Sequence, residues 1–128
     1  MKIAQVAPLF ESVPPRAYGG TERVVSYLTE ALVEMGHEVT LFASGDSITL
    51  ANLVSVVPRG LRLNPHKPDP LVWHTIMMDM VLKAAQSFDV IHFHTDVHQL
   101  ALVSHCRTPC VSTAHGRLDL PDLKSLFR

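Results

Sequence analysis

Apolar and polar positions divide the chain into segments that alternate between strand-like and helix-like patterns. Residues 2–10 are mostly apolar at both odd and even positions, which predicts a strand covered on both faces of a sheet. Apolar residues then recur at helical spacing over residues 22–35, with Thr21 as the expected cap at the start of this helix. Gly36 follows directly, where a helix commonly ends in a left-handed residue.

The alternation continues along the rest of the chain. Further strands are predicted over residues 37–43, 53–57, 88–94 and 110–114, and further helices over residues 71–87 and from residue 95 or 96 to about 105. Asp69-Pro70 supplies a capping carboxylate followed by proline, which is a strong helix start. Strands joined by helix-length connections pair in parallel. The sequence therefore predicts a single Rossmann-like, doubly wound α/β domain over residues 1–128, with strand order 3-2-1-4-5.

Composition narrows the classes of protein to which the chain can belong. The chain has 128 residues, 47% of them apolar, and a net charge of −1, which suits one globular domain. The charge disfavours a nucleic-acid-binding protein that uses a broad basic face. No apolar run approaches the ~20 residues that span a bilayer, and we expect no signal peptide at the N-terminus. Cys106 and Cys110 are too few for a disulfide framework, which indicates a cytoplasmic protein. We expect both cysteines to serve as small, buried apolar side chains.

Candidate binding residues follow the ends of the predicted strands. Ligands of an open parallel sheet bind beyond the carboxyl ends of its strands. Gly19 and Gly20 lie there at the start of the first helix, whose free N–H groups suit a phosphate, although the two glycines could instead serve only the turn. Their spacing does not match the dinucleotide fingerprint G-x-G-x-x-G, and the chain has no G-K-[ST] motif. Asp46, after the second strand, is interpreted as a turn residue.

Histidines gather near the ends of the fourth and fifth predicted strands. His115 precedes a glycine at a strand end and is the strongest candidate for a catalytic residue, because an imidazole can transfer a proton near neutral pH. The alternative is that His115 only caps the strand end. His94 is expected to line the same site, His92 to be structural beneath it, and His98 to lie on the surface. A zinc site built from these histidines lacks a completing carboxylate or thiolate, so we expect no metal.

Several motifs in combination resemble the beginning of a family 4 glycosyltransferase. They are YGGTERVV at residues 18–25, GHEVTLFA at residues 36–43, FDVIHFH at residues 88–94, and Ala114-His115-Gly116. The resemblance implies a GT-B architecture, in which two Rossmann-like lobes face each other across a cleft. The N-terminal lobe mostly meets the acceptor, and the C-terminal lobe holds a nucleotide sugar. Such enzymes retain the anomeric configuration and need no metal or other cofactor.

The resemblance also implies roles for individual residues. Gly19 and Gly20 would lie beside the donor diphosphate, and His115 would be catalytic, facing the transferred sugar. Glu22 and His94 are expected to contact substrate. Residues 1–128 would then be an acceptor-side lobe without its donor-binding partner lobe, inactive alone, from a hexosyltransferase-like parent.

The expected partners are a nucleotide sugar and an unidentified acceptor. We expect neither nucleic acid nor a transmembrane segment, and peripheral membrane contact only for a lipid acceptor. Two alternatives remain open. One is a stand-alone small-ligand or phosphate-binding α/β module without catalysis, and the other is an NAD-type oxidoreductase lobe, which the glycine spacing disfavours.

Overall fold

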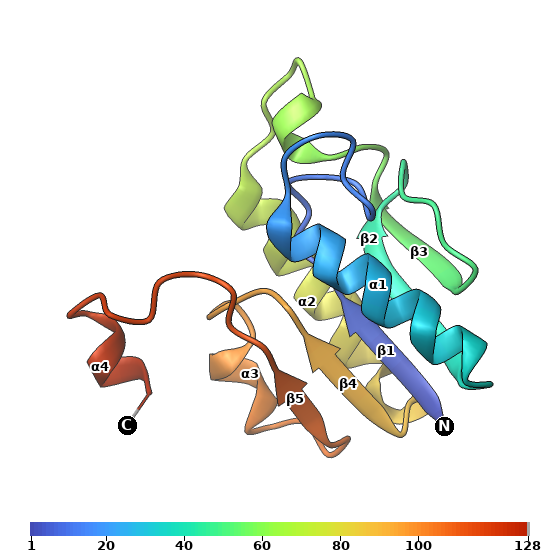
Figure 1. Ribbon diagram of the computed structural model, residues 1–128. Helices are drawn as coiled ribbons and strands as arrows, with labels where there is room; N and C mark the ends of the chain where they lie inside the picture. The colour runs from blue at the N-terminus through green and yellow to red at the C-terminus, as the bar shows by residue number, and fades with distance from the viewer. Residues whose placement is uncertain (128) are drawn as a thin grey trace.

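A five-stranded sheet forms the centre of the computed structural model, which describes residues 1–127 (Figure 1). Every strand pairs in parallel with its neighbour, and the order is β3-β2-β1-β4-β5, which confirms the predicted topology. The strands are β1 (Lys2–Val6), β2 (Glu38–Ser44), β3 (Asn52–Val57), β4 (Val90–Phe93) and β5 (Cys110–Ser112). This order places the carboxyl ends of β1, β4 and β5 side by side at one edge of the sheet.

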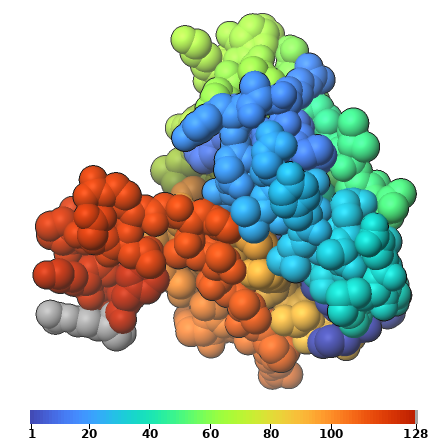
Figure 2. All heavy atoms as spheres, in the orientation of Figure 1, coloured from blue at the N-terminus to red at the C-terminus, as the bar shows by residue number. Residues whose placement is uncertain are grey.

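Helices cover both faces of this sheet. On one face lies α1 (Gly20–Glu34) and on the other lies α2 (Pro70–Ala84) (Figure 1). The shorter elements are the 3₁₀ turns η1 (Leu61–Leu63) and η2 (Ala85–Ser87) and the helices α3 (Leu100–Val103) and α4 (Leu123–Leu126). The segment that carries α4 stands out from the rest of the molecule (Figures 1 and 2). No helix within residues 1–127 combines the length and the apolar character needed to cross a bilayer.

The apolar core consists of two layers separated by the sheet. The larger layer lies under α2, where strand residues such as Phe42 and Phe93 pack against Met77 and Val81 of the helix. The smaller layer lies under α1 and includes Val25 and Leu41, together with Ala7, Val13 and Ala43. Burying one side chain of the Val, Leu or Phe class contributes roughly 1.5–3 kcal/mol. Both faces of the central strands are therefore apolar, as the sequence predicted.

Three of the predicted helix signals can be compared directly with the structure. Asp69 caps α2, because its Oδ1 atom accepts the N–H of Leu71 at 2.9 Å and Pro70 occupies the first turn. Gly36 has φ +90°, the left-handed conformation expected after α1. The predicted cap Thr21 is wrong: α1 begins at Gly20 and its cap is Gly19, which has φ +155°.

Two predicted boundaries are wrong by four residues or more. The first strand ends at Val6 rather than at residue 10, because the N–H of Leu9 bonds to the His74 ring and its carbonyl accepts the N–H of Leu61. Leu9 therefore bonds to residues of α2 and η1 instead of pairing within the sheet. Helix α3 begins only at Leu100, since Asp96 adopts φ +53° and residues 96–99 form turns.

Candidate functional site

A cavity of about 620 Å³ lies beyond the carboxyl ends of β1 and β4, against the start of α1. All five residues predicted to form the site line it, namely Gly19, Gly20, Glu22, His94 and His115. They come from segments far apart in the sequence, and the parallel strand order brings them together. Their chemical roles remain predictions, but all five residues line the same cavity.

The two glycines at the start of α1 have different surroundings. A Cβ atom on Gly19 would lie 2.8 Å from Cβ of Pro15 and 2.9 Å from Oε2 of Glu22, and its φ of +155° disfavours any other residue. Gly20 has nothing within 4 Å of the position of a Cβ atom. Gly19 is thus required by the local packing, whereas Gly20 leaves open space at the cavity. The first amides of a helix have no acceptor within the helix, and those of Gly20 and Thr21 donate no hydrogen bond within residues 1–127, so they can bind an anion.

Glu22 lines the cavity but is itself only 5% exposed. It occupies the third position of α1, where a carboxylate can reach back to the free amides of the first turn. Burial raises the pKa of Glu22, while the backbone N–H of Glu22 opposes this shift; the charge of Glu11 raises the pKa further and that of Arg62 lowers it. Glu22 is thus a buried carboxylate at the cavity wall with a raised pKa, and its contact with substrate remains a prediction.

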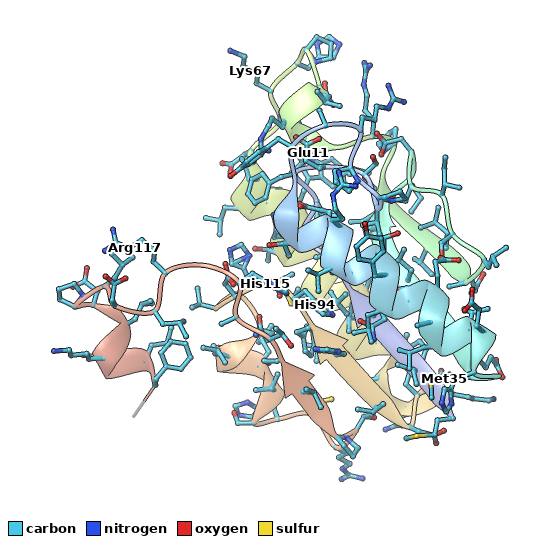
Figure 3. The ribbon with its side chains drawn as sticks, in the orientation of Figure 1. Glu11, Met35, Lys67, His94, His115 and Arg117 are labelled. Atoms are coloured by element: carbon cyan, nitrogen blue, oxygen red, sulfur yellow. The ribbon has the colours of Figure 1, made fainter. Side chains whose placement is uncertain are left out.

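The two predicted histidines contact each other at the cavity wall (Figure 3). Nδ1 of His94 lies 3.0 Å from Nε2 of His115, and the rings are 5.3 Å apart and close to parallel. On its other side, Nε2 of His94 lies 2.7 Å from Oε1 of Gln5, which is buried on β1. Burial, followed by the nearby rings of His92 and His115, lowers the pKa of His94 to about 3. His94 is therefore neutral at physiological pH.

The turn that carries His115 is held by Asp96. Oδ1 of Asp96 accepts the backbone N–H of His115 at 2.8 Å and that of Gly116 at 3.2 Å. Asp96 follows β4 in a left-handed conformation, which aspartate tolerates better than most residues. Nearby, the buried amide of Gln99 donates to the Asp96 carbonyl and to Ser112 on β5. The ends of β4 and β5 are thus joined by side chains as well as by the sheet.

The other histidines of this region have structural contacts. Nε2 of His92 bonds to Thr113 Oγ1 at 2.7 Å, which agrees with its predicted structural role. His74 is buried, accepts the N–H of Leu9 and bonds to the Pro70 carbonyl; burial lowers its pKa. His98 is exposed as predicted, yet it also lines the cavity and meets the His74 ring edge to face at 4.9 Å.

Comparison with known proteins decides the family. The family model described as Glycosyltransferase Family 4 matches residues 18–128. The chain belongs to glycosyltransferase family 4. Among solved structures it is similar to AviGT4, a glycosyltransferase involved in avilamycin A biosynthesis, with 30% sequence identity and a TM-score of 0.50. That match covers 76% of this family 4 chain and 27% of AviGT4, so the chain spans about a quarter of the length of that enzyme. A search of curated proteins finds no match.

Three residues at or directly behind this cavity were absent from the sequence-based prediction. Gln5 is a polar residue within an otherwise apolar buried strand, a signal that could have marked it. His74 reaches the cavity from α2, and its helical position alone gave no signal. Arg62 lies on η1, inside a stretch that the sequence indicated only as an irregular loop.

Arg62 supplies a positive charge at the cavity wall of this family 4 chain. Its Nη1 atom lies 2.9 Å from Oε1 of the buried Glu11, and its guanidinium carbon lies 5.5 Å from the centre of the Tyr18 ring. Within residues 1–127, no group of three or more His, Cys, Asp or Glu side chains is arranged to hold a metal ion. The cavity therefore presents helix amides, imidazoles and one guanidinium, together with the carboxylates of Glu22 and Asp96.

Proposed function

We propose that this chain is the N-terminal, acceptor-side lobe of a GT-B glycosyltransferase that transfers a sugar, such as a hexose, from a nucleotide sugar to an acceptor with retention of configuration and without a metal. One observation carries the proposal: the open face of Gly20 at the start of α1 and the ring of His115 line the same cavity. A cavity of this kind offers an anion-binding surface and a hydrogen-bonding imidazole together.

The start of α1 suits the diphosphate of the donor. Amides at a helix N-terminus carry partial positive charge and point outward, and the absence of a side chain on Gly20 lets phosphate oxygens approach them. Negative charge grows on the diphosphate as the bond to the sugar breaks. Fixed amides that face this charge stabilise the transition state more than the ground state, which favours departure of the nucleoside diphosphate.

His115 suits the transferred sugar and the incoming acceptor. The residue is half-buried at the cavity wall, and Asp96 holds its backbone. An imidazole fixed in this way can bind a sugar hydroxyl and orient the ring for attack. Orientation of two reacting groups is a large part of the rate enhancement of an enzyme.

The test is a turnover assay on the complete gene product that contains this chain. UDP-, GDP- and ADP-sugars are supplied with candidate acceptors, and release of nucleoside diphosphate is measured. Gly20→Val should abolish or strongly weaken donor use, because a branched side chain would fill the approach to the amides. Ala31→Val is the control, because Ala31 is exposed in α1 far from the cavity end of the helix. Equal activity of Gly20→Val and the wild type would contradict the proposal.

A binding experiment on residues 1–128 separates this function from a stand-alone binding module. The donor base and ribose are expected to contact the partner lobe of a GT-B enzyme. Calorimetric titration of the 128-residue chain with the same nucleotide sugars should then give no binding in the low micromolar range. Tight binding to this chain would favour the stand-alone module instead.

A further inference from the structure

Three side chains form a line from the buried sheet to the cavity. Gln5 on β1 and His94 after β4 are each 1% exposed, whereas His115 is half-buried at the cavity wall. Oε1 of Gln5 lies 2.7 Å from Nε2 of His94, and Nδ1 of His94 lies 3.0 Å from Nε2 of His115. Gln5 does not line the cavity that residues 1–127 form, so its effect on the cavity must pass through His94.

The chemistry of these groups fixes the direction of both hydrogen bonds. An amide oxygen only accepts, so Nε2 of His94 carries a hydrogen and donates it to Gln5. His94 is neutral, because it is buried and has the His92 ring 4.0 Å away on one side and His115 on the other. A neutral imidazole has one N–H, so Nδ1 of His94 is an acceptor. The hydrogen between the two rings therefore belongs to Nε2 of His115.

With its hydrogen on Nε2, the neutral form of His115 has its free lone pair on Nδ1. No hydrogen bond formed within residues 1–127 involves that atom, and the backbone N–H of His115 is fixed by Asp96. We propose that Gln5 and His94 are positioning residues that hold His115 in its Nε2–H tautomer, so that Nδ1 accepts a hydrogen bond from a hydroxyl of the sugar bound in the cavity. The identity of the ligand rests on the proposed function, but the tautomer does not.

Selection of one tautomer has a measurable advantage for a hydroxyl ligand. A free imidazole exchanges between two tautomers, and the other form would carry an N–H at Nδ1, where this form has an acceptor. A ring already held in the accepting form does not have to reorganise when the sugar binds. Loss of this arrangement should weaken use of the sugar by up to about fivefold, which is the effect of losing one neutral hydrogen bond completely.

The tautomer can be read directly by long-range ¹H–¹⁵N NMR of the 128-residue chain labelled at histidine nitrogen. At pH 7.5 the wild type should show His94 and His115 both protonated at Nε2 and unprotonated at Nδ1. Gln5→Met keeps a similar side-chain length but removes the oxygen, and His115 should then give a mixture of both tautomers. Gln86→Met, at an exposed position of η2, is the matched control and should leave the wild-type signals unchanged.

Two results would overturn the inference. Protonation of His115 at Nδ1 in the wild type would reverse the direction of the bonds, and this measurement does not depend on whether any variant folds. An unchanged His115 tautomer in Gln5→Met, with folding verified by urea unfolding, would remove the role of Gln5. The wild-type spectrum thus decides the tautomer even if Gln5→Met does not fold.

Turnover of the complete gene product tests the sugar hydroxyl. Gln5→Met should lower kcat/KM by up to about fivefold with the natural donor, and this difference from the wild type should vanish with one member of a series of monodeoxy donor analogues. A difference that persists with every analogue would contradict the hydroxyl contact. Absence of turnover with all nucleotide sugars would reject the proposed function and, with it, the sugar contact, while the NMR result on the tautomer would stand.

Discussion

Oδ1 of Asp96 accepts the backbone N–H of His115 at 2.8 Å, which joins the turn after β4 to the turn after β5. The same oxygen also accepts the N–H of Gly116 at 3.2 Å. Because β5 ends at Ser112, the sheet alone does not fix His115, and the Asp96 carboxylate also holds it at the cavity.

Replacement of Asp96 should therefore destabilise the turn. Asp96→Ala removes the acceptor and places alanine at φ +53°, and these effects together should lower the free energy of unfolding by about 1–3 kcal/mol. Asp96→Asn keeps an oxygen acceptor and tolerates the left-handed conformation, so it is the matched control and should cost less. Urea unfolding followed by circular dichroism measures both variants. Equal losses for Ala and Asn would show that the acceptor and the backbone conformation contribute little.

The two glycines should respond differently to alanine. Gly19→Ala would bring a Cβ atom to 2.8 Å from Pro15 at an unfavourable φ, and should cost about 1–3 kcal/mol. Gly20→Ala meets open space at the first position of α1, and should be neutral or stabilising by up to about 1 kcal/mol. Thermal unfolding of the two variants side by side tests this difference. A large loss for Gly20→Ala would mean that the space beside Gly20 is not open.

His94 should make the chain sensitive to acid. Its pKa is about 3 in the folded state, whereas an unfolded histidine titrates near 6.5. Between these values the unfolded state binds more protons, so stability is full above pH 6.5 and is lost as pH falls towards 3. The loss attributable to His94 should reach about 2 kcal/mol at pH 5 relative to pH 8.

Urea unfolding at pH 8, 6.5 and 5 measures this effect. His94→Gln has no titrating ring, so its free energy of unfolding should fall less than that of the wild type over this range. Its remaining slope reflects other groups, among them His74, whose pKa burial also lowers. His66→Gln is the control, since His66 is exposed. Parallel curves for the wild type and His94→Gln would contradict the low pKa of His94.

His115→Ala should separate catalysis from folding. The ring is half-buried at the cavity wall, so its removal should cost about 1 kcal/mol of stability or less. In the complete gene product, turnover should fall by about 10²-fold or more, as expected when a group acts in proton transfer or in orienting the substrate. His105→Ala, at an exposed position, is the control. Turnover of His115→Ala within about twofold of the wild type would leave His115 with a structural role only.

The sheet could be predicted from the sequence because its strands are apolar on both faces and are separated by helix-length segments. Those two properties allow few arrangements, and the strand order follows from right-handed crossovers. The wrong boundaries have local causes that only tertiary contacts reveal. Leu9 leaves the sheet for the His74 ring, and Asp96 adopts a left-handed conformation that stops α3 from starting there.

The candidate site, like the sheet, could be predicted in part from the sequence. A rule about strand ends was enough to select Gly20, His94 and His115, because parallel strands place their carboxyl ends together. Gln5 was missed because its importance depends on which side chain of the neighbouring strand it meets. Arg62 was missed because its position depends on how an irregular loop folds over the cavity.

The hydrogen bond between Gln5 and His94 joins positions 89 residues apart, and the one between His94 and His115 joins positions 21 apart. Pairings across such separations are slow to form, because the intervening chain must lose its freedom first. As the ribosome synthesises the chain from its N-terminus, Gln5 emerges well before the residue that completes its hydrogen bond. The line of contacts from Gln5 to His115 is thus complete only when β1, β4 and β5 have come together in the sheet.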